Sequence, residues 1–229
     1  PCIIKGNVMV TSYYSCDPDP DIPCKHNGLV VFERDELGSW SQNAFMEVPG
    51  ADDKSWLVYD LTADDNNPEM DRIVVSVAGG SNGQVHMFER NSDGVFTHYQ
   101  EIENPDANGG GEYGFGSGIA IDGRNLVVGN PSFPNNGNYK GTVYAVRRKS
   151  SGVWDHVYDW KGADNNDQIG DEVGIHGNTV VFQTERSSSD GGNNRCYLYN
   201  RISNTNWELI QTINENSLDL DTFTEGGVL

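Results

Sequence analysis

Oxygen-bearing side chains with the chemistry of metal ligands gather near residue 164 of this sequence. Four of those in the segment "KGADNNDQIGDE" are candidate ligands: Asp164, Asn166, Asp167 and Asp171. Calcium prefers carboxylate and amide oxygens, so this loop is a candidate calcium site. The same residue types also cap and solvate turns, and that interpretation stays open.

The four cysteines carry a second chemical signal. Cys16 and Cys24 bracket a short loop that contains prolines, which predicts a local disulfide and favours an oxidising compartment. Cys2 and Cys196 could pair only if the fold joined the two ends of the chain. A zinc site on Cys16, Cys24 and His26 is the alternative, although their spacing matches no common zinc pattern.

Two short segments match catalytic or cofactor-binding motifs by their letters, but neither lies in the structural context that its motif requires. "GGSNG" around Ser81 matches a nucleophile elbow, but it lies between two strand-like segments and not between a strand and a helix. "GGGEYG" at 109–114 matches a dinucleotide fingerprint, but no helix follows it. A glycosidase needs two facing carboxylates, and the 34 acidic residues single out no pair. We therefore predict no catalytic residue.

The charge of the chain narrows the class of partner. The formal net charge is −19 at pH 7, which argues against nucleic acid and against an anionic membrane surface. It favours solubility, basic partners or divalent cations. No apolar run approaches the roughly 20 residues that a membrane-spanning helix needs.

The elements that must position these residues are short strands that recur along the chain. "GNVMVTS", "DRIVVSV", "RNLVVGN" and "NTVVFQT" begin at residues 6, 71, 124 and 178. Each leads to an aromatic-bearing segment that ends in a basic residue, and then to one of Trp40, Phe96, Trp154 and Trp207. A period of about 50 residues is typical of repeat architectures.

Each repeat contains four alternating segments. In the third they are 115–121, 125–129, 142–147 and 153–160, separated by turn signals such as Asp122-Gly123. Four antiparallel strands per repeat predict an all-β fold, a β-propeller built of four-stranded blades. A β-sandwich also has many short strands, but it gives no reason for a four-strand repeat.

The whole chain is expected to form one propeller region. The units are approximately 1–54, 55–108, 109–162 and 163–216, with the start of another at 217–229. We expect the chain to begin at the second strand of a blade, over 7–13, and to end at a first strand, over 222–229. The last strand could close a four-bladed ring, but we favour about four blades of a larger ring.

The repeat resembles the FG-GAP repeats of the integrin alpha-subunit propeller and its relatives. The third unit has Phe115-Gly116 at its first strand and Gly129-Asn130-Pro131 where that family has Gly-Ala-Pro. The fourth has Ile169-Gly170 and has lost the second motif. The resemblance covers nearly the whole chain and implies a seven-bladed propeller, usually extracellular, that binds proteins or glycans.

The resemblance also implies where calcium would bind. Several members of the family hold calcium in a loop between the first and second strands of a blade. In the second unit that loop reads "TADDNNPEMDR", although its proline and missing glycine depart from the family pattern. Its candidate ligands are Asp64, Asp65, Asn67, Glu69 and Asp71.

We therefore expect a non-enzymatic interaction or structural module, extracellular or at the cell surface, with the lumen of an organelle as the alternative. Partner contacts are expected at the irregular loops 12–27, 60–71 and 131–140, because loops on a rigid scaffold carry binding. Two alternatives stay open. One is a polysaccharide-active hydrolase or lyase with its site in the propeller channel, and the other is an architectural subunit of a larger assembly.

Overall fold

The computed structural model describes residues 2–14, 27–51, 56–62, 71–78, 83–106, 114–133, 138–185, 194–203 and 205–214. These residues form strands and turns but no helix, and so they include no helix that could span a bilayer. The strands make four antiparallel four-stranded sheets, each in sequence order. The first blade consists of β1 (Cys2–Lys5), β2 (Val8–Tyr14), β3 (Asn27–Arg34) and β4 (Trp40–Glu47). The second consists of β5 (Trp56–Thr62), β6 (Arg72–Ala78), β7 (Gln84–Arg90) and β8 (Phe96–Ile102). The third consists of β9 (Ile119–Asp122), β10 (Asn125–Asn130), β11 (Thr142–Arg148) and β12 (Trp154–Lys161), and the fourth of β13 (Val173–His176), β14 (Thr179–Gln183), β15 (Arg195–Arg201) and β16 (Trp207–Asn214).

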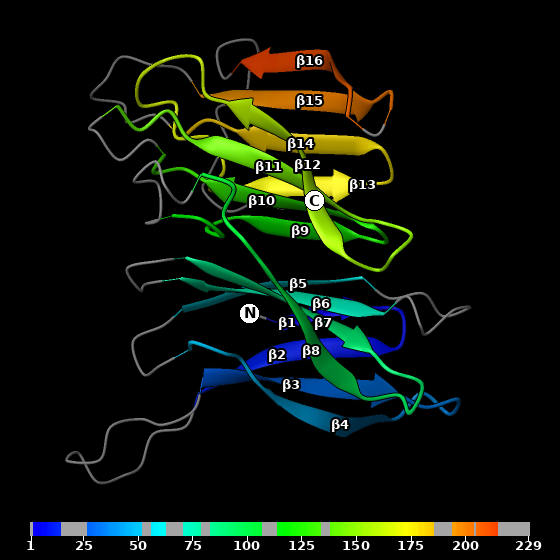
Figure 1. Cartoon of the computed structure of the whole chain (residues 1–229). Helices are drawn as coiled ribbons and strands as arrows, with labels where there is room; N and C mark the ends of the chain where they lie inside the picture. The colour runs from blue at the N-terminus through cyan, green and yellow to red at the C-terminus, as the bar shows by residue number, and fades with distance from the viewer. Residues whose placement is uncertain are drawn as a thin grey trace, which may run out of the picture.

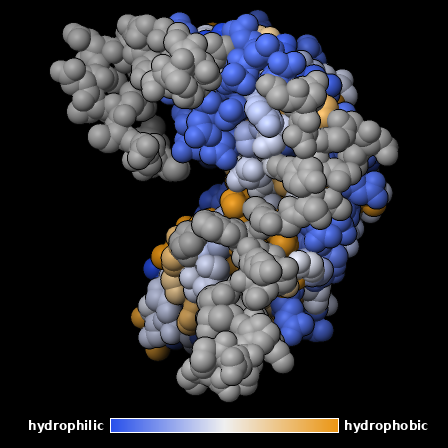
Figure 2. All heavy atoms as spheres, turned by 90° about the vertical axis from the view of Figure 1, so that its left-hand side faces the viewer, coloured by the Kyte–Doolittle hydropathy of each residue, from blue (hydrophilic) through white to orange (hydrophobic). Residues whose placement is uncertain are grey.

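The four sheets are the blades of a β-propeller, as the repeat predicts. The first strands of successive blades are neighbours, because β1 contacts β5, β5 contacts β9 and β9 contacts β13. Figure 1 shows β5 and β9 in the middle, with the first two blades extending below them and the last two above. In the space-filling view of Figure 2, the outline of the described residues is hollowed on one side, between the lower and the upper blades. The described blades therefore form an arc.

Glycine turns join the first two strands in three of the blades. The loops are two residues long and begin with Gly6, Gly123 and Gly177, whose φ angles are 58°, 57° and 58°. Glycine adopts this left-handed conformation without a steric penalty, which is why these hairpins can be so tight. Each blade also has a register shift between its third and fourth strands.

The basic residue that ends each third strand explains part of the sequence repeat. Its backbone N–H donates to the residue before the second strand, as Arg34 does to the carbonyl of Asn7 and Arg90 to that of Asp71. In the first, second and fourth blades its guanidinium also lies over the aromatic ring that opens the fourth strand, at 5.7–5.9 Å. The arginine and the aromatic residue recur together because they pack together.

Apolar side chains fill the space between blades. Alternating strand residues point to the blade before and to the blade after. The second strands of the two central blades, β6 and β10, are therefore buried on both faces. Val10 packs toward the second blade, and Val74 and Val127 occupy the matching positions in the next two interfaces. All three side chains are fully buried.

Three expectations about the strands need correction. The chain does not begin at a second strand, because β1 precedes β2 and pairs with it from Cys2 opposite Thr11. The first unit therefore completes a blade, and its equivalent of Asp71 is Asn7, one residue later than the sequence alignment placed it. The first strand of the third unit starts at Ile119, because Gly116 has a φ of 89° and turns the chain before it.

Candidate binding groove

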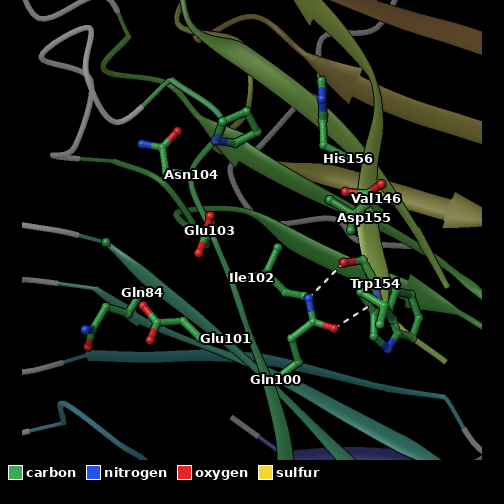
Figure 3. Close-up of a pocket in the computed structure, with 13 residues that line it drawn as sticks. Gln84, Gln100, Glu101, Ile102, Glu103, Asn104, Val146, Trp154, Asp155 and His156 are labelled. Atoms are coloured by element: carbon green, nitrogen blue, oxygen red, sulfur yellow. Dashed lines mark hydrogen bonds between the residues drawn. The ribbon is translucent and has the colours of Figure 1, made fainter. Parts of the chain in front are cut away.

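A groove of about 830 Å³ lies between the second and third blades. One wall is the end of β8 with the residues that follow it, up to Pro105, and the other is the start of β12. Figure 3 shows Glu103 and Asn104 on the first wall and Asp155 and His156 on the second. The groove therefore sits at the outer strands of two neighbouring blades.

The Gln100 side chain joins the two walls at one end of the groove. Its Oε1 accepts from the backbone N–H of Trp154 at 2.9 Å, and its Nε2 donates to the Trp154 carbonyl oxygen at 2.8 Å. Both bonds are drawn in Figure 3. The amide thus pairs with β12 as a backbone peptide would, and it fixes the spacing of the walls. Because both polar atoms of the amide bond to β12, Gln100 holds the two walls of the groove in position.

Three carboxylates are among the side chains that line the groove. Glu101 and Glu103 come from the first wall and Asp155 from the second, and all three are exposed. Asp155 forms an ion pair with Lys149, whereas Glu103 has no ion-pair or hydrogen-bond partner among the residues that the structure describes. The groove is therefore acidic and suits a ligand that donates hydrogen bonds.

A buried tyrosine holds the first wall in place. The Tyr144 hydroxyl donates to Asp106 Oδ2 at 3.0 Å, which ties the turn after β8 to the third blade. Burial raises the pKa of Tyr144 above its ordinary value, and the Asp106 carboxylate raises it further, so the phenol stays protonated and remains a donor. The same turn is closed by Asn104, whose Oδ1 accepts from the Asp106 N–H at 3.0 Å.

A second groove lies one interface further on. It has a volume of about 260 Å³ and lies between the third and fourth blades. Its wall from β12 begins at Tyr158, which stands opposite Ala145 as Gln100 stands opposite Met87. Aromatic side chains line it, including Trp160, Tyr197 and Tyr199. Its other wall comes from β14 and β15 and not from the start of a fourth strand, so only the first wall is repeated.

The structure brings together part of the first calcium candidate, around an arginine. Arg195 Nη2 donates to Asp164 Oδ2 at 2.9 Å and to Asp167 Oδ1 at 2.7 Å. Asp167 is fully buried, and its Oδ2 accepts from the Asp164 N–H. A cation at these two carboxylates would have to replace the guanidinium. Asn166, with a φ of 61°, shapes the turn.

Asp171 contacts a different partner. It lies beside Glu185, whose pKa is raised by burial and then by the charge of Asp171 and a hydrogen bond with it. Within the described ranges, His, Cys, Asp and Glu side chains form no group of three that would suit a metal ion. Calcium at this loop stays a prediction, which thermal unfolding with calcium and with chelator would test.

The second calcium candidate is described only at its last residue. Asp71 is buried, and its Oδ2 accepts from Arg90 Nη1 at 3.0 Å. Its other predicted members, Asp64, Asp65, Asn67 and Glu69, lie outside the described residues.

The cysteines of the predicted disulfide, Cys16 and Cys24, also lie outside the described residues, as does His26. Cys2 and Cys196 are free thiols. Cys2 is on β1 of the first blade and Cys196 on β15 of the fourth, the two ends of the arc. Burial raises the pKa of the Cys196 thiol, which keeps it protonated and unreactive at neutral pH.

Comparisons with known proteins bear on the fold. No protein-family model and no curated protein matches the chain. A hypothetical selenium-binding protein from Sulfolobus tokodaii superposes with a TM-score of 0.55 at 11% identity, over 91% of this chain and 52% of that one. The chain thus spans about half the length of that protein.

Two further solved structures are less similar. The periplasmic gluconolactonase of Pseudomonas aeruginosa matches with a TM-score of 0.42 at 12% identity, over 91% of this chain and 67% of that one. The Aleuria aurantia lectin matches with a TM-score of 0.40 at 12% identity, over 89% and 63%. At these identities a structural likeness concerns the fold and leaves the activity open.

Proposed function

We propose that this propeller is a binding module, and that the groove between β8 and β12 takes a neutral glycan. The observation that carries the proposal is the acidic, acceptor-rich lining around a groove whose width is fixed by Gln100. Sugar hydroxyls donate hydrogen bonds to carboxylate and amide oxygens, and they need no opposite charge. In keeping with the FG-GAP resemblance, we place this activity outside the cell or on its surface.

The rigidity of the two groove walls supports this proposal. Binding pays less entropy when the contact residues are already held in place. Here the Gln100 amide fixes β12, and the Tyr144 hydroxyl fixes the turn that follows β8 through Asp106. The acidic lining also disfavours anionic ligands, because carboxylates facing an anion repel it.

The test is a screen of the full chain against neutral and anionic oligosaccharides, followed by calorimetry on any hit. Glu103→Gln removes a charge from the groove, and we expect it to weaken binding about 5–50-fold if the carboxylate accepts from a sugar hydroxyl. Glu36→Gln is the matched control, because Glu36 is exposed on the turn after β3, away from the groove.

Salt dependence separates a glycan from a basic peptide, the other donor-rich ligand. Affinity for a neutral glycan should hardly change between 50 and 500 mM salt, whereas affinity for a cation should fall steeply. No binding to any neutral glycan, or equal affinity in Glu103→Gln and the parent, would refute the proposal. Hydrolysis of the bound glycan would instead favour the polysaccharide-active enzyme.

A further inference from the structure

A carboxylate joins the second and third blades. Trp154 Nε1 donates to Glu89 Oε1 at 3.2 Å. The Arg148 guanidinium donates to both oxygens of Glu89, from Nε at 2.8 Å and from Nη2 at 2.9 Å. The two donors belong to the third blade and the acceptor to the second, so the repeat shows which residues hold the same positions in the next interface.

The interface between the third and fourth blades repeats the donors. Trp207 corresponds to Trp154 and Arg201 to Arg148, because each tryptophan stands opposite the arginine that ends the third strand of its blade. The Arg201 guanidinium also lies over the Trp207 ring, at 5.9 Å. The fourth blade therefore presents to the third an indole N–H and a guanidinium, as the third does to the second.

The acceptor is not repeated. Glu89 directly precedes the arginine that ends β7, and the residue at that position of β11 is Arg147. Opposite Arg147 on β10 stands Asn125, where the second blade has Arg72 opposite Glu89. A donor thus occupies the strand position from which a carboxylate accepts one interface earlier.

The indole of Trp207 is left without an acceptor. Trp207 is 8% exposed, and its buried Nε1 has no hydrogen-bond partner among the residues that the structure describes. Buried donors are nearly always paired, because an unpaired one loses its bond to water and gains none in return. The Trp207 N–H is therefore the first sign of a missing group.

Arg201 bonds to amides and to no carboxylate. Its Nη1 donates to Asn125 Oδ1 at 2.6 Å and its Nη2 to Asn178 Oδ1. Within the described ranges, no Asp or Glu side chain forms an ion pair with Arg201, and its Nε has no acceptor. The pKa of Arg201 is lowered by burial and then by the positive charge of Arg147, so the two guanidiniums are close enough to repel each other.

We propose that a small oxyanion, a carboxylate or a sulfate-type ion, binds between the third and fourth blades in the place that the Glu89 carboxylate takes one interface earlier. Trp207 Nε1 and Arg201 Nε donate to it, and Arg147 adds a second positive charge. Guanidinium groups bind carboxylates and related oxyanions through charge-assisted hydrogen bonds, which are stronger than neutral ones.

The surroundings make this site selective. The formal net charge of the chain is −19, so general electrostatic attraction works against anions and only a local set of donors can hold one. Arg147 and Arg201 are half-buried, which leaves the ion a path from solvent. The proposal does not depend on the glycan groove, which lies between the second and third blades.

The test is a titration of the ¹⁵N-labelled full chain, followed by the indole N–H signals in NMR spectra. The chain has five tryptophans, and the signal that is missing in Trp207→Phe belongs to Trp207. The probes are sodium acetate and sodium sulfate, each from about 0.1 to 20 mM, with the ionic strength held constant by sodium chloride. We expect a saturable shift of the Trp207 signal, because its N–H gains an acceptor, and little change in the other four.

A matched pair of arginine variants locates the ion. Arg201→Gln should weaken binding at least about 10-fold, because it removes a charged donor. Arg124→Gln should leave the affinity unchanged, because Arg124 is exposed and donates to the Arg148 carbonyl oxygen. If Arg201→Gln does not fold, Arg201→Lys replaces it, since lysine keeps the charge but lacks the Nε donor.

A built-in carboxylate gives an independent readout. In Arg147→Glu, the new side chain should compete with the added ion, so the Trp207 signal should lie near its anion-bound position before any anion is added. A Trp207 signal in the parent chain that does not move with either anion would overturn the proposal. Equal affinities in Arg201→Gln and Arg124→Gln would also overturn it, because the ion would then bind elsewhere.

Discussion

Glu89 is the acceptor on which three side-chain donors converge, between the second and third blades. Its Oε1 accepts from Arg72 Nε at 2.9 Å, from Arg148 Nε at 2.8 Å and from Trp154 Nε1 at 3.2 Å. Burial alone would raise the pKa of Glu89, but the hydrogen bonds from Arg148, Arg72 and Trp154 outweigh it and hold the pKa below its ordinary value. The carboxylate therefore stays charged inside the interface.

Replacing Glu89 by Gln should cost about 3 kcal/mol of unfolding free energy. The change leaves the Arg72 guanidinium, which is 2% exposed, without its counter-charge, and breaking a buried pair is strongly destabilising. Urea unfolding measures the loss. The control Glu36→Gln should change stability by less than about 0.5 kcal/mol. A similarly small effect for Glu89→Gln would show that the ion pairs contribute little.

His86 makes the free energy of unfolding depend on pH, and it does so at higher pH than Glu89. It is buried, and its Nδ1 lies 3.2 Å from Nε2 of His98. Burial lowers the pKa of His86 below its ordinary value of 6.5, against the charge of Glu101, which raises it. The unfolded chain then binds the proton more readily than the folded one, so stability is complete above about pH 6.5 and falls as the pH drops below it.

We expect the unfolding free energy to decrease by up to about 1.4 kcal/mol per pH unit below pH 6.5. Replacing His86 by Gln should flatten this dependence between pH 6.5 and 5, while His176→Gln, at a side chain that is 99% exposed, should not. Urea titrations at pH 7.5, 6 and 5 give the slopes. Glu89 contributes only at lower pH, below about 4.5. An unchanged slope in His86→Gln would assign the dependence to other groups.

At the scale of elements, glycines decide how closely neighbouring blades approach. Gly116 donates to the Gly129 carbonyl at 2.8 Å, and the Gly129 N–H donates to the Gly118 carbonyl at 2.8 Å, so the two matched motifs of the third unit are bonded to each other. A Cβ on Gly129 would overlap the backbone of Gly170, at the start of the fourth blade. Gly170 itself has a φ of 111°.

Gly129→Ala should therefore destabilise the chain by at least about 2 kcal/mol, because backbone atoms of the next blade must move. Gly123→Asn is the matched control: its φ is 57°, no atom lies near its missing Cβ, and Asn tolerates that conformation. The control should cost less than about 1 kcal/mol in the same thermal or urea measurement. Equal losses would show that backbone conformation, and not inter-blade contact, determines the requirement for glycine.

These elements also show what the sequence can predict. Strand alternation and turn residues placed the last three strands of the third unit within one residue of β10, β11 and β12. The same signals missed β1, because three of its four residues are exposed and show no alternation of buried and exposed positions. A strand of this kind is recognised by its partner β2 and by no pattern of its own.

The candidate sites were harder to predict, because residues far apart in sequence make them. The Asp164 loop was recognised as oxygen-rich, but Arg195, from β15, determines what its carboxylates bond to. The groove carries no motif at all. Gln100 reaches Trp154 only because two blades pack in one register, and that register is a property of the repeat as a whole.

At the scale of the whole molecule, a chain of polar contacts crosses the interfaces. In two of the three described interfaces, the arginine that ends the third strand reaches the residue before the matching arginine of the preceding blade: Arg90 reaches Glu33, and Arg148 reaches Glu89. In the third blade that residue is Arg147. Burial lowers the pKa of Arg201, and the charge of Arg147 lowers it further. The pattern is thus interrupted between the third and fourth blades.

Placing a glutamate opposite Arg201 should restore the arginine–glutamate contact between the third and fourth blades. We expect this to raise the free energy of unfolding by about 1 kcal/mol, the upper end of the range for a partly exposed ion pair. Arg147→Glu alone would place a carboxylate opposite Asp155 on β12, where the second blade has Thr97 opposite Glu89. The informative variant is therefore Arg147→Glu with Asp155→Thr, which reproduces the second-blade arrangement and gives Arg201 a counter-charge. Urea midpoints should rise for this variant, and rise less at high salt.

Arg201→Gln in the same background provides the decisive comparison. If the gain comes from the new pair across the interface, it disappears when the arginine is removed, and the double-mutant cycle gives the coupling energy. A gain that survives Arg201→Gln would come from relieving charge within the third blade, and the interrupted contact would then matter little to cohesion. Loss of the gain would show that the blade interfaces are matched to one another by charge as well as by apolar packing.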